Sequence, residues 1–111
     1  MGNGPFGVPF DGTNVWVTNG VATTVSKLQA SSGALVGTYT VGSDPRGIAF
    51  DGTNIWVANY GSNNASELLA STGTVVATYP GGSCPDGMAF DGANMWVAVA
   101  NSASVSKMPA F

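Results

Sequence analysis

Histidine is absent from this 111-residue chain, and cysteine occurs once, as Cys84. A lone cysteine cannot form an intrachain disulfide, and without histidine the usual base for a nucleophilic side chain is missing. The sequence has no His/Cys/Asp spacing typical of a metal site and no phosphate-cradling glycine loop followed by a helix. We therefore expect no catalytic residue, no metal and no cofactor, and we interpret the chain as non-enzymatic.

Charge is also scarce. Charged residues make up 8% of the chain, against about 25% in a typical soluble protein. The three cations Lys27, Arg46 and Lys107 are scattered, so no basic patch for nucleic acid is expected. No run approaches the roughly 18 apolar residues of a membrane span. A surface of Ser, Thr, Asn and Gly suits an extracellular or cell-envelope protein, or one covered by copies of itself.

One phrase is repeated at a fixed period. The pattern Phe-Asp-Gly-(Thr/Ala)-Asn-(Val/Ile/Met)-Trp-Val starts at Phe10, Phe50 and Phe90, which lie 40 residues apart. A fixed period of this size indicates a repeat architecture, in which each unit stacks on a neighbour to bury its faces. The expected units are residues 1–40, 41–80 and 81–111 of a single repeat domain.

The central unit predicts four short strands at residues 45–50, 55–59, 65–69 and 74–79. They are rich in β-branched and aromatic residues and are separated by Gly/Asn/Ser turns. No window has helical periodicity. Four antiparallel strands in 40 residues is the size of a β-propeller blade, whereas the coils of a parallel β-helix are shorter. The sequence therefore predicts an all-β propeller.

The full pattern Pro-x-Gly-(Val/Ile/Met)-x-Phe-Asp-Gly-x-Asn-x-Trp-Val resembles bacterial propeller repeats of the YVTN and NHL type, including the blades of virginiamycin B lyase-like proteins. The resemblance covers essentially the whole chain. It implies that the first strand of each blade lines the central channel and the fourth lies at the rim. In the lyase family it implies chemistry that needs a histidine and a metal-binding acidic residue. This chain has no histidine and one glutamate, so that activity is not carried over.

The third unit is short. Three units of 40 residues need 120, and the chain has 111. The difference corresponds to the fourth strand of the last blade, so we expect two full blades and one three-stranded blade. Its third strand, at residues 105–108, becomes an outer edge. Lys107 in this strand and Pro109 after it are the kind of residue that protects an edge from pairing with other chains.

The blades at the two ends should expose apolar faces, and burying these against identical chains would close a ring by head-to-tail contact. Two chains give six blades and three give nine. Propellers usually hold about four to eight blades, which favours the homodimer over the homotrimer.

Two sets of repeated residues are interpreted structurally. The aspartates of the Asp-Gly pairs fit tight turns, because a group needed for chemistry would occur once and these occur in every unit. Aromatic residues within the strands are expected to pack between blades: Trp16, Trp56, Trp96, Phe10, Phe50 and Phe90.

A binding site should instead lie where the repeats differ. After the shared proline come Phe6, Arg46 and Asp86, and Tyr60 lies in a loop expected on the same face. These four residues could line a pocket for a small polar ligand or glycan; the alternative is drift of exposed loops with a weak Arg46–Asp86 ion pair. The sequence thus leaves two main hypotheses, a self-assembling structural module and a ligand-binding module. A hydrolase or lyase fragment that borrows residues from other blades is a third.

Overall fold

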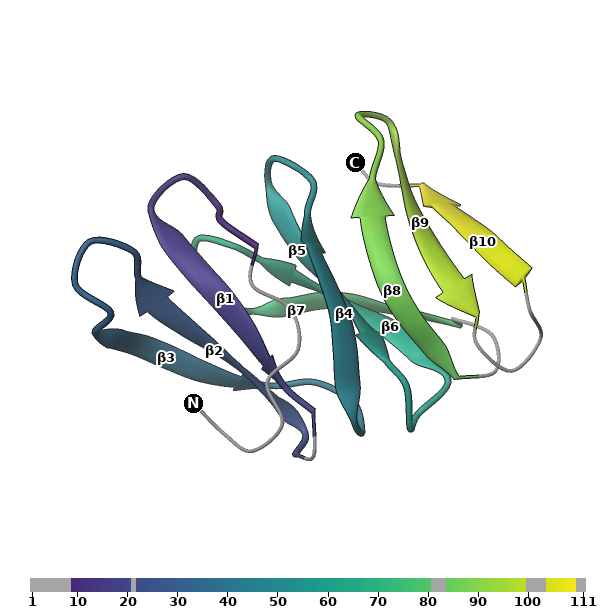
Figure 1. Ribbon diagram of the computed structural model, residues 1–111, viewed down its shortest axis with the longest axis horizontal. Helices are drawn as coiled ribbons and strands as arrows, with labels where there is room; N and C mark the ends of the chain where they lie inside the picture. Colours follow the sequence, from purple (N-terminus) through teal and green to yellow (C-terminus); the bar gives the residue numbers. More distant parts are fainter. Residues whose placement is uncertain (1–8, 21, 81–83, 100–103, 110–111) are drawn as a thin grey trace.

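The computed structural model describes residues 9–20, 22–80, 84–99 and 104–109, and all of its regular structure is β-strand. Three antiparallel sheets follow one another along the chain (Figure 1). The first sheet contains β1 (Asn14–Asn19), β2 (Thr24–Gln29) and β3 (Leu35–Thr40). The second contains β4 (Pro45–Phe50), β5 (Asn54–Asn59), β6 (Asn64–Leu69) and β7 (Val75–Pro80). The third contains β8 (Pro85–Phe90), β9 (Asn94–Val99) and β10 (Ser104–Pro109).

The second sheet is the complete repeat, with its strands in chain order from β4 to β7. The predicted all-β class is confirmed, and the strand bounds of this repeat agree with the sequence prediction to within one residue. The third sheet has the order β8-β9-β10, so β10 is its outer strand within the described part of the chain. Phe6 lies outside the described residues. In the first sheet only an isolated bridge between Phe10 and Val15 precedes the ladder of β1 and β2.

The turn between the first two strands of each repeat has a local cause. Gly12, Gly52 and Gly92 all have φ near +100°, a conformation that L side chains rarely adopt. The preceding aspartate accepts hydrogen bonds from the backbone amides two and three residues later, at 2.7–3.0 Å in all three repeats. This Asx turn explains why Asp-Gly recurs at the same place in each unit.

The sheets pack face to face through two apolar junctions. In the first junction, between the first and second sheets, Trp16 and Val25 pack against Ile55, Val57 and Leu68. In the second junction, Trp56 of the second sheet packs with Met95 and Val97 of the third. Each tryptophan therefore points from its own sheet toward the next one along the chain. β5 is buried along both faces, which explains why its sequence is apolar without alternation.

The innermost strands β4 and β8 run next to each other (Figure 1). A Cβ atom added to Gly47 would lie 1.9 Å from the Asp86 carbonyl oxygen and 2.9 Å from the Met88 amide nitrogen. Only glycine therefore fits at this position, where the backbones of two sheets meet. None of the described segments forms a helix with the length and hydrophobicity that crossing a bilayer requires.

Candidate functional site

Each repeat ties its tryptophan to the aspartate of its own turn. The indole Nε1 of Trp16 donates to Asp11 Oδ2 at 2.9 Å, and that of Trp56 donates to Asp51 Oδ2 at 2.8 Å. The sequence analysis assigned the aspartates to the turns and did not anticipate this second role. The signal was the constant five-residue spacing between the two residue types. The bond leaves the indole nitrogen satisfied while the ring is buried between sheets.

The hydrogen bonds also act on the carboxylates. At Asp91 the bond from Trp96, together with two backbone amides, lowers the pKa from 3.8 to about 2. At Asp11 burial is the largest influence and opposes the shift. Bonds from Trp16 and from the backbone outweigh it, so the pKa of Asp11 also falls below its ordinary value. Both groups are therefore anions at neutral pH, held by donors that they need to be charged to satisfy well.

The third repeat has the same internal geometry but a different exposure. Trp96 Nε1 donates to Asp91 Oδ2 at 2.7 Å, yet the Trp96 side chain is 37% exposed, whereas Trp16 and Trp56 are 0% exposed. Burial alternates along β9, with one face packed on the second sheet and the other open to solvent. A shallow apolar hollow on this open face is lined by Gly87, Met88, Ala89, Trp96, Ala98 and Val105. We call this surface the trailing face.

The opposite end of the molecule has a complementary surface. Val15 and Leu28 of the first sheet are half-buried, while their counterparts Ile55 and Leu68 are fully buried in the first junction. Phe10 is 57% exposed. We call this surface, formed by Phe10, Val15 and Leu28, the leading face. The molecule thus ends on the two halves of the junction that it forms twice internally.

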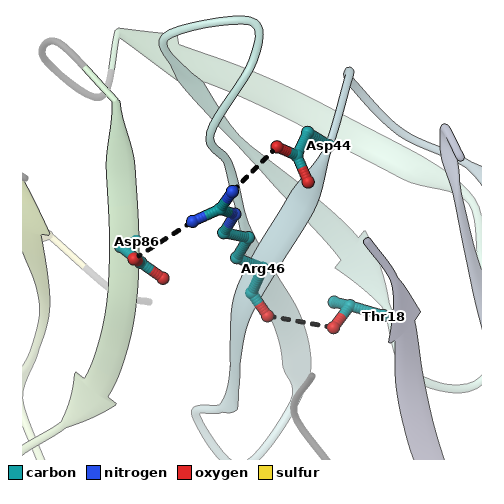
Figure 2. Close-up of polar contacts among 4 residues, drawn as sticks. All are labelled: Thr18, Asp44, Arg46 and Asp86. Carbon is teal, nitrogen blue, oxygen red and sulfur yellow. Dashed lines mark hydrogen bonds and ion pairs between the residues drawn. The ribbon is translucent and has the colours of Figure 1, made fainter. Parts of the chain in front are cut away.

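The residues proposed from the divergent loops come together, except for Phe6, which is outside the described residues. Arg46 on β4 lies between two carboxylates, with Nη2 3.2 Å from Asp44 Oδ2 and Nη1 3.7 Å from Asp86 Oδ2 (Figure 2). The guanidinium carbon is 3.6 Å from the centre of the Tyr60 ring. Burial acts to lower the pKa of Arg46, but the nearby carboxylates outweigh it and raise the value.

The Arg46 cluster also joins the three sheets. The Thr18 hydroxyl on β1 donates to the Arg46 carbonyl oxygen at 2.9 Å, while the guanidinium reaches Asp86 on β8 (Figure 2). Asp44 has a φ of 50°, a strained conformation that turns the chain into β4. An incoming anion would have to displace a carboxylate from Arg46, so this geometry favours a brace between sheets over a ligand pocket. Sequence reasoning did not find Thr18 or Asp44, because their roles depend on how adjacent sheets meet.

The two residues expected to protect an edge lie on β10. Lys107 is exposed, and its Nζ is 5.8 Å from the centre of the Trp96 ring. Pro109 is paired along the backbone with Asn94, and its side chain lies outside the described part of the chain. Within the described residues, no group of three or more His, Cys, Asp or Glu side chains gathers where it could hold a metal ion.

Comparison with known proteins gives structural matches only. No family profile and no curated protein matches the sequence. Hydrazine synthase of Kuenenia stuttgartiensis superposes with a TM-score of 0.78 and 25% identity, over 86% of this chain and 29% of that one. A functionally unknown protein from Desulfotomaculum acetoxidans gives 0.74 and 19%, over 94% and 41%. A streptogramin B lyase gives 0.70 and 20%, over 96% and 40%.

These similarities show a fold of the β-propeller type. The lyase match agrees, at the level of the fold, with the resemblance expected from the sequence. The chain spans between 29% and 41% of the length of the three matched proteins.

Proposed function

We propose that this chain, with its YVTN/NHL-type repeats, is a non-enzymatic propeller segment that closes a ring by binding identical copies of itself. The observation that carries the proposal is the exposure of Trp96. Two tryptophans at the equivalent position are fully buried by the next sheet, and the third makes the same bond to its aspartate but has no sheet over it.

The energetics support association. Burying the remaining 37% of Trp96 removes enough apolar surface from water to contribute about 2 kcal/mol. Val105 is 62% exposed beside it and Phe10 is 57% exposed on the leading face. An apolar surface of this kind at both ends of the molecule is typical of an interaction site.

Identical chains are the partner that the two faces fit. The trailing face presents the tryptophan side of a junction, and the leading face presents the side that receives a tryptophan in the first junction. Contact between unlike faces is heterologous, and it ends only when the ring closes. Propellers usually contain about four to eight blades, so we propose a six-bladed dimer ahead of a nine-bladed trimer.

The non-enzymatic part of the proposal is supported by how the acidic residues are used. Asp11, Asp51 and Asp91 bind their turns and tryptophans. Asp44 and Asp86 bind Arg46. Glu67 accepts hydrogen bonds from Asn54 and from the Tyr79 hydroxyl. With no histidine in the sequence, a general base would have to be taken from one of these structural sets.

A charge placed on the trailing face tests the proposal. Trp96→Arg should leave a folded chain with the β-sheet circular dichroism of the original, because one face of β9 is already open, but it should give a monomer by light scattering. Thr38→Arg, which adds the same charge to an exposed site on β3, is the control and should assemble normally. Assembly of Trp96→Arg at the same mass as the unmodified protein would refute the proposed interface.

A further inference from the structure

The first junction contains a buried cation in addition to its apolar contacts. Lys27 on β2 is 5% exposed, and its Nζ lies 5.2 Å from the centre of the Trp16 ring. The same ammonium donates a 2.7 Å hydrogen bond across the junction to the carbonyl oxygen of Ala70. A charge-assisted bond of this kind fixes where one sheet sits on the next, because displacing it would leave a buried ammonium without its acceptor.

The donor half of this arrangement is repeated on the third sheet. Lys107 pairs with Trp96 across β10 and β9, as Lys27 pairs with Trp16 across β2 and β1. Its Nζ is already 5.8 Å from the Trp96 ring centre. Lys107 is exposed, in contrast to Lys27. The ammonium is therefore held over the indole at the border of the trailing face.

The acceptor half is repeated on the first sheet. In the turn after β6, the Ala70 amide donates to the Thr53 carbonyl at 3.3 Å and the Gly73 amide donates to Leu69 at 2.7 Å. The turn after β2 has the equivalent bonds, from Ala30 to Thr13 and from Gly33 to Gln29, at the same distances. Ala70 is 9% exposed, and Ala30 is exposed. The Ala30 turn thus has the shape of an acceptor that is used at Ala70.

Gly87 indicates what approaches the trailing face. Its counterpart Gly47 lies so close to the backbone of the third sheet that a Cβ atom could not fit. At Gly87 an added Cβ would meet nothing within 4 Å, and its φ is not in the left-handed region. Glycine within a strand weakens it, so nothing within the chain accounts for Gly87. A neighbouring backbone that approaches as closely as β8 approaches Gly47 would account for it.

The second junction differs, which selects between the possible acceptors. Glu67 takes the place of the lysine there and binds Asn54 and Tyr79 of its own sheet, at 2.7 and 2.9 Å. The Ala70 carbonyl is already used by Lys27. The matching turn that remains exposed in the described structure is the Ala30 turn.

We propose that Lys107 binds the carbonyl oxygen of Ala30 in a second copy of this chain, and that Gly87 receives the innermost backbone of that copy. The junction between copies then reproduces the first junction within the chain. This inference rests on the proposed ring, and it adds the atoms that set the register and direction of the contact.

Crosslinking between two single-cysteine proteins tests the contact. In a Cys84→Ser background, Ala30→Cys and Lys107→Cys would be made separately, mixed, and treated with a short bis-maleimide. We expect a covalent dimer from the mixture and much less from either protein alone. Lys27→Cys combined with Ala70→Cys in one chain calibrates the reaction, because these positions meet within the chain. Efficient calibration with no crosslink in the mixture would overturn the inference.

Two substitutions test the energetics. Gly87→Val should prevent assembly while the isolated chain stays as stable as before or more so, because valine favours strands and the space is open. Gly47→Val is the contrasting variant and should unfold the chain. Lys107→Met should weaken association about tenfold through loss of one charge-assisted hydrogen bond, whereas Lys27→Met should lower stability instead.

The outcomes separate this inference from the proposed function. If the unmodified protein is a monomer, both fail. If it forms a ring that is unaffected by Gly87→Val and Lys107→Met, the proposed function stands and the Lys107–Ala30 contact is wrong.

Discussion

Trp96 donates its indole hydrogen to Asp91 at 2.7 Å, yet its ring remains 37% exposed. The same pair in the other two repeats is closed over by the following sheet. The tryptophan is therefore oriented by its own repeat before any neighbour covers it. This preorganisation means that a partner does not have to order the side chain on binding, which removes part of the entropic cost of association.

The difference in exposure predicts a difference between two otherwise equal substitutions. Trp56→Ala should destabilise the folded chain by about 3–5 kcal/mol, as expected for a large side chain removed from a packed core. Trp96→Ala should cost much less when measured on the isolated chain, and should act mainly on association. Urea unfolding of both variants checks this, and equal losses in a dilute monomeric sample would contradict it.

The lowered pKa of Asp91 predicts a dependence of stability on acid. Because its pKa in the folded protein is about 2 and its ordinary value is 3.8, its stabilising contribution is present above about pH 4 and lost as the pH falls toward 2. Asp91→Asn should lower the melting temperature at neutral pH, and the difference from the unmodified protein should shrink between pH 4 and pH 2. Asp11 and Asp51 are present in both proteins, so their titration cancels. A constant difference over that range would show that the charge of Asp91 is not involved.

The carboxylate of Asp51 should matter more than its place in a turn suggests. It accepts one side-chain and two backbone hydrogen bonds, including that of the fully buried Trp56. Asp51→Ala leaves the indole N–H without its acceptor and should cost about 2–3 kcal/mol. Thr53→Ala, in the same turn, keeps the backbone bonds to Asp51 and is the control. Chemical denaturation measures both, and similar losses would refute the special role of Asp51.

The cluster around Arg46 should behave as a weak brace. Its ion pairs are partly exposed, and such pairs contribute about 0.2–1 kcal/mol. A double-mutant cycle of Arg46→Met and Asp86→Asn should give a coupling energy in this range that falls with added salt. The ligand-binding hypothesis predicts something else: an acidic sugar or other small anion would raise the melting temperature, and Arg46→Met would abolish that effect. Observing that pattern would favour a pocket over a brace.

The sequence predicted the architecture well because period and strand pattern are local properties. The repeats of Asp-Gly and the runs around Ile55 were enough to place the strands of the second sheet. The repeat alignment also placed Arg46 and Asp86 at equivalent positions, and the structure places them 3.7 Å apart.

The contacts across the junctions could not be predicted in the same way. The Lys27 bond to Ala70 joins residues 43 positions apart and depends on how closely two sheets approach, which no local pattern contains. Asp44 contributes through a positive φ, and Thr18 through a hydroxyl aimed at a carbonyl on another sheet. Gly87 was read as ordinary turn punctuation at the sequence level. Its meaning emerges only when its empty surroundings are compared with those of Gly47.

The mass of the intact particle in solution tests the central claim most directly. Native mass spectrometry of the unmodified chain over a dilution series should give twice the 11.1 kDa protomer mass, or three times that mass for the larger ring, with no open-ended ladder of higher species. A single species of 11.1 kDa at all concentrations would contradict the account, because the exposed tryptophan face would then have no copy to cover it.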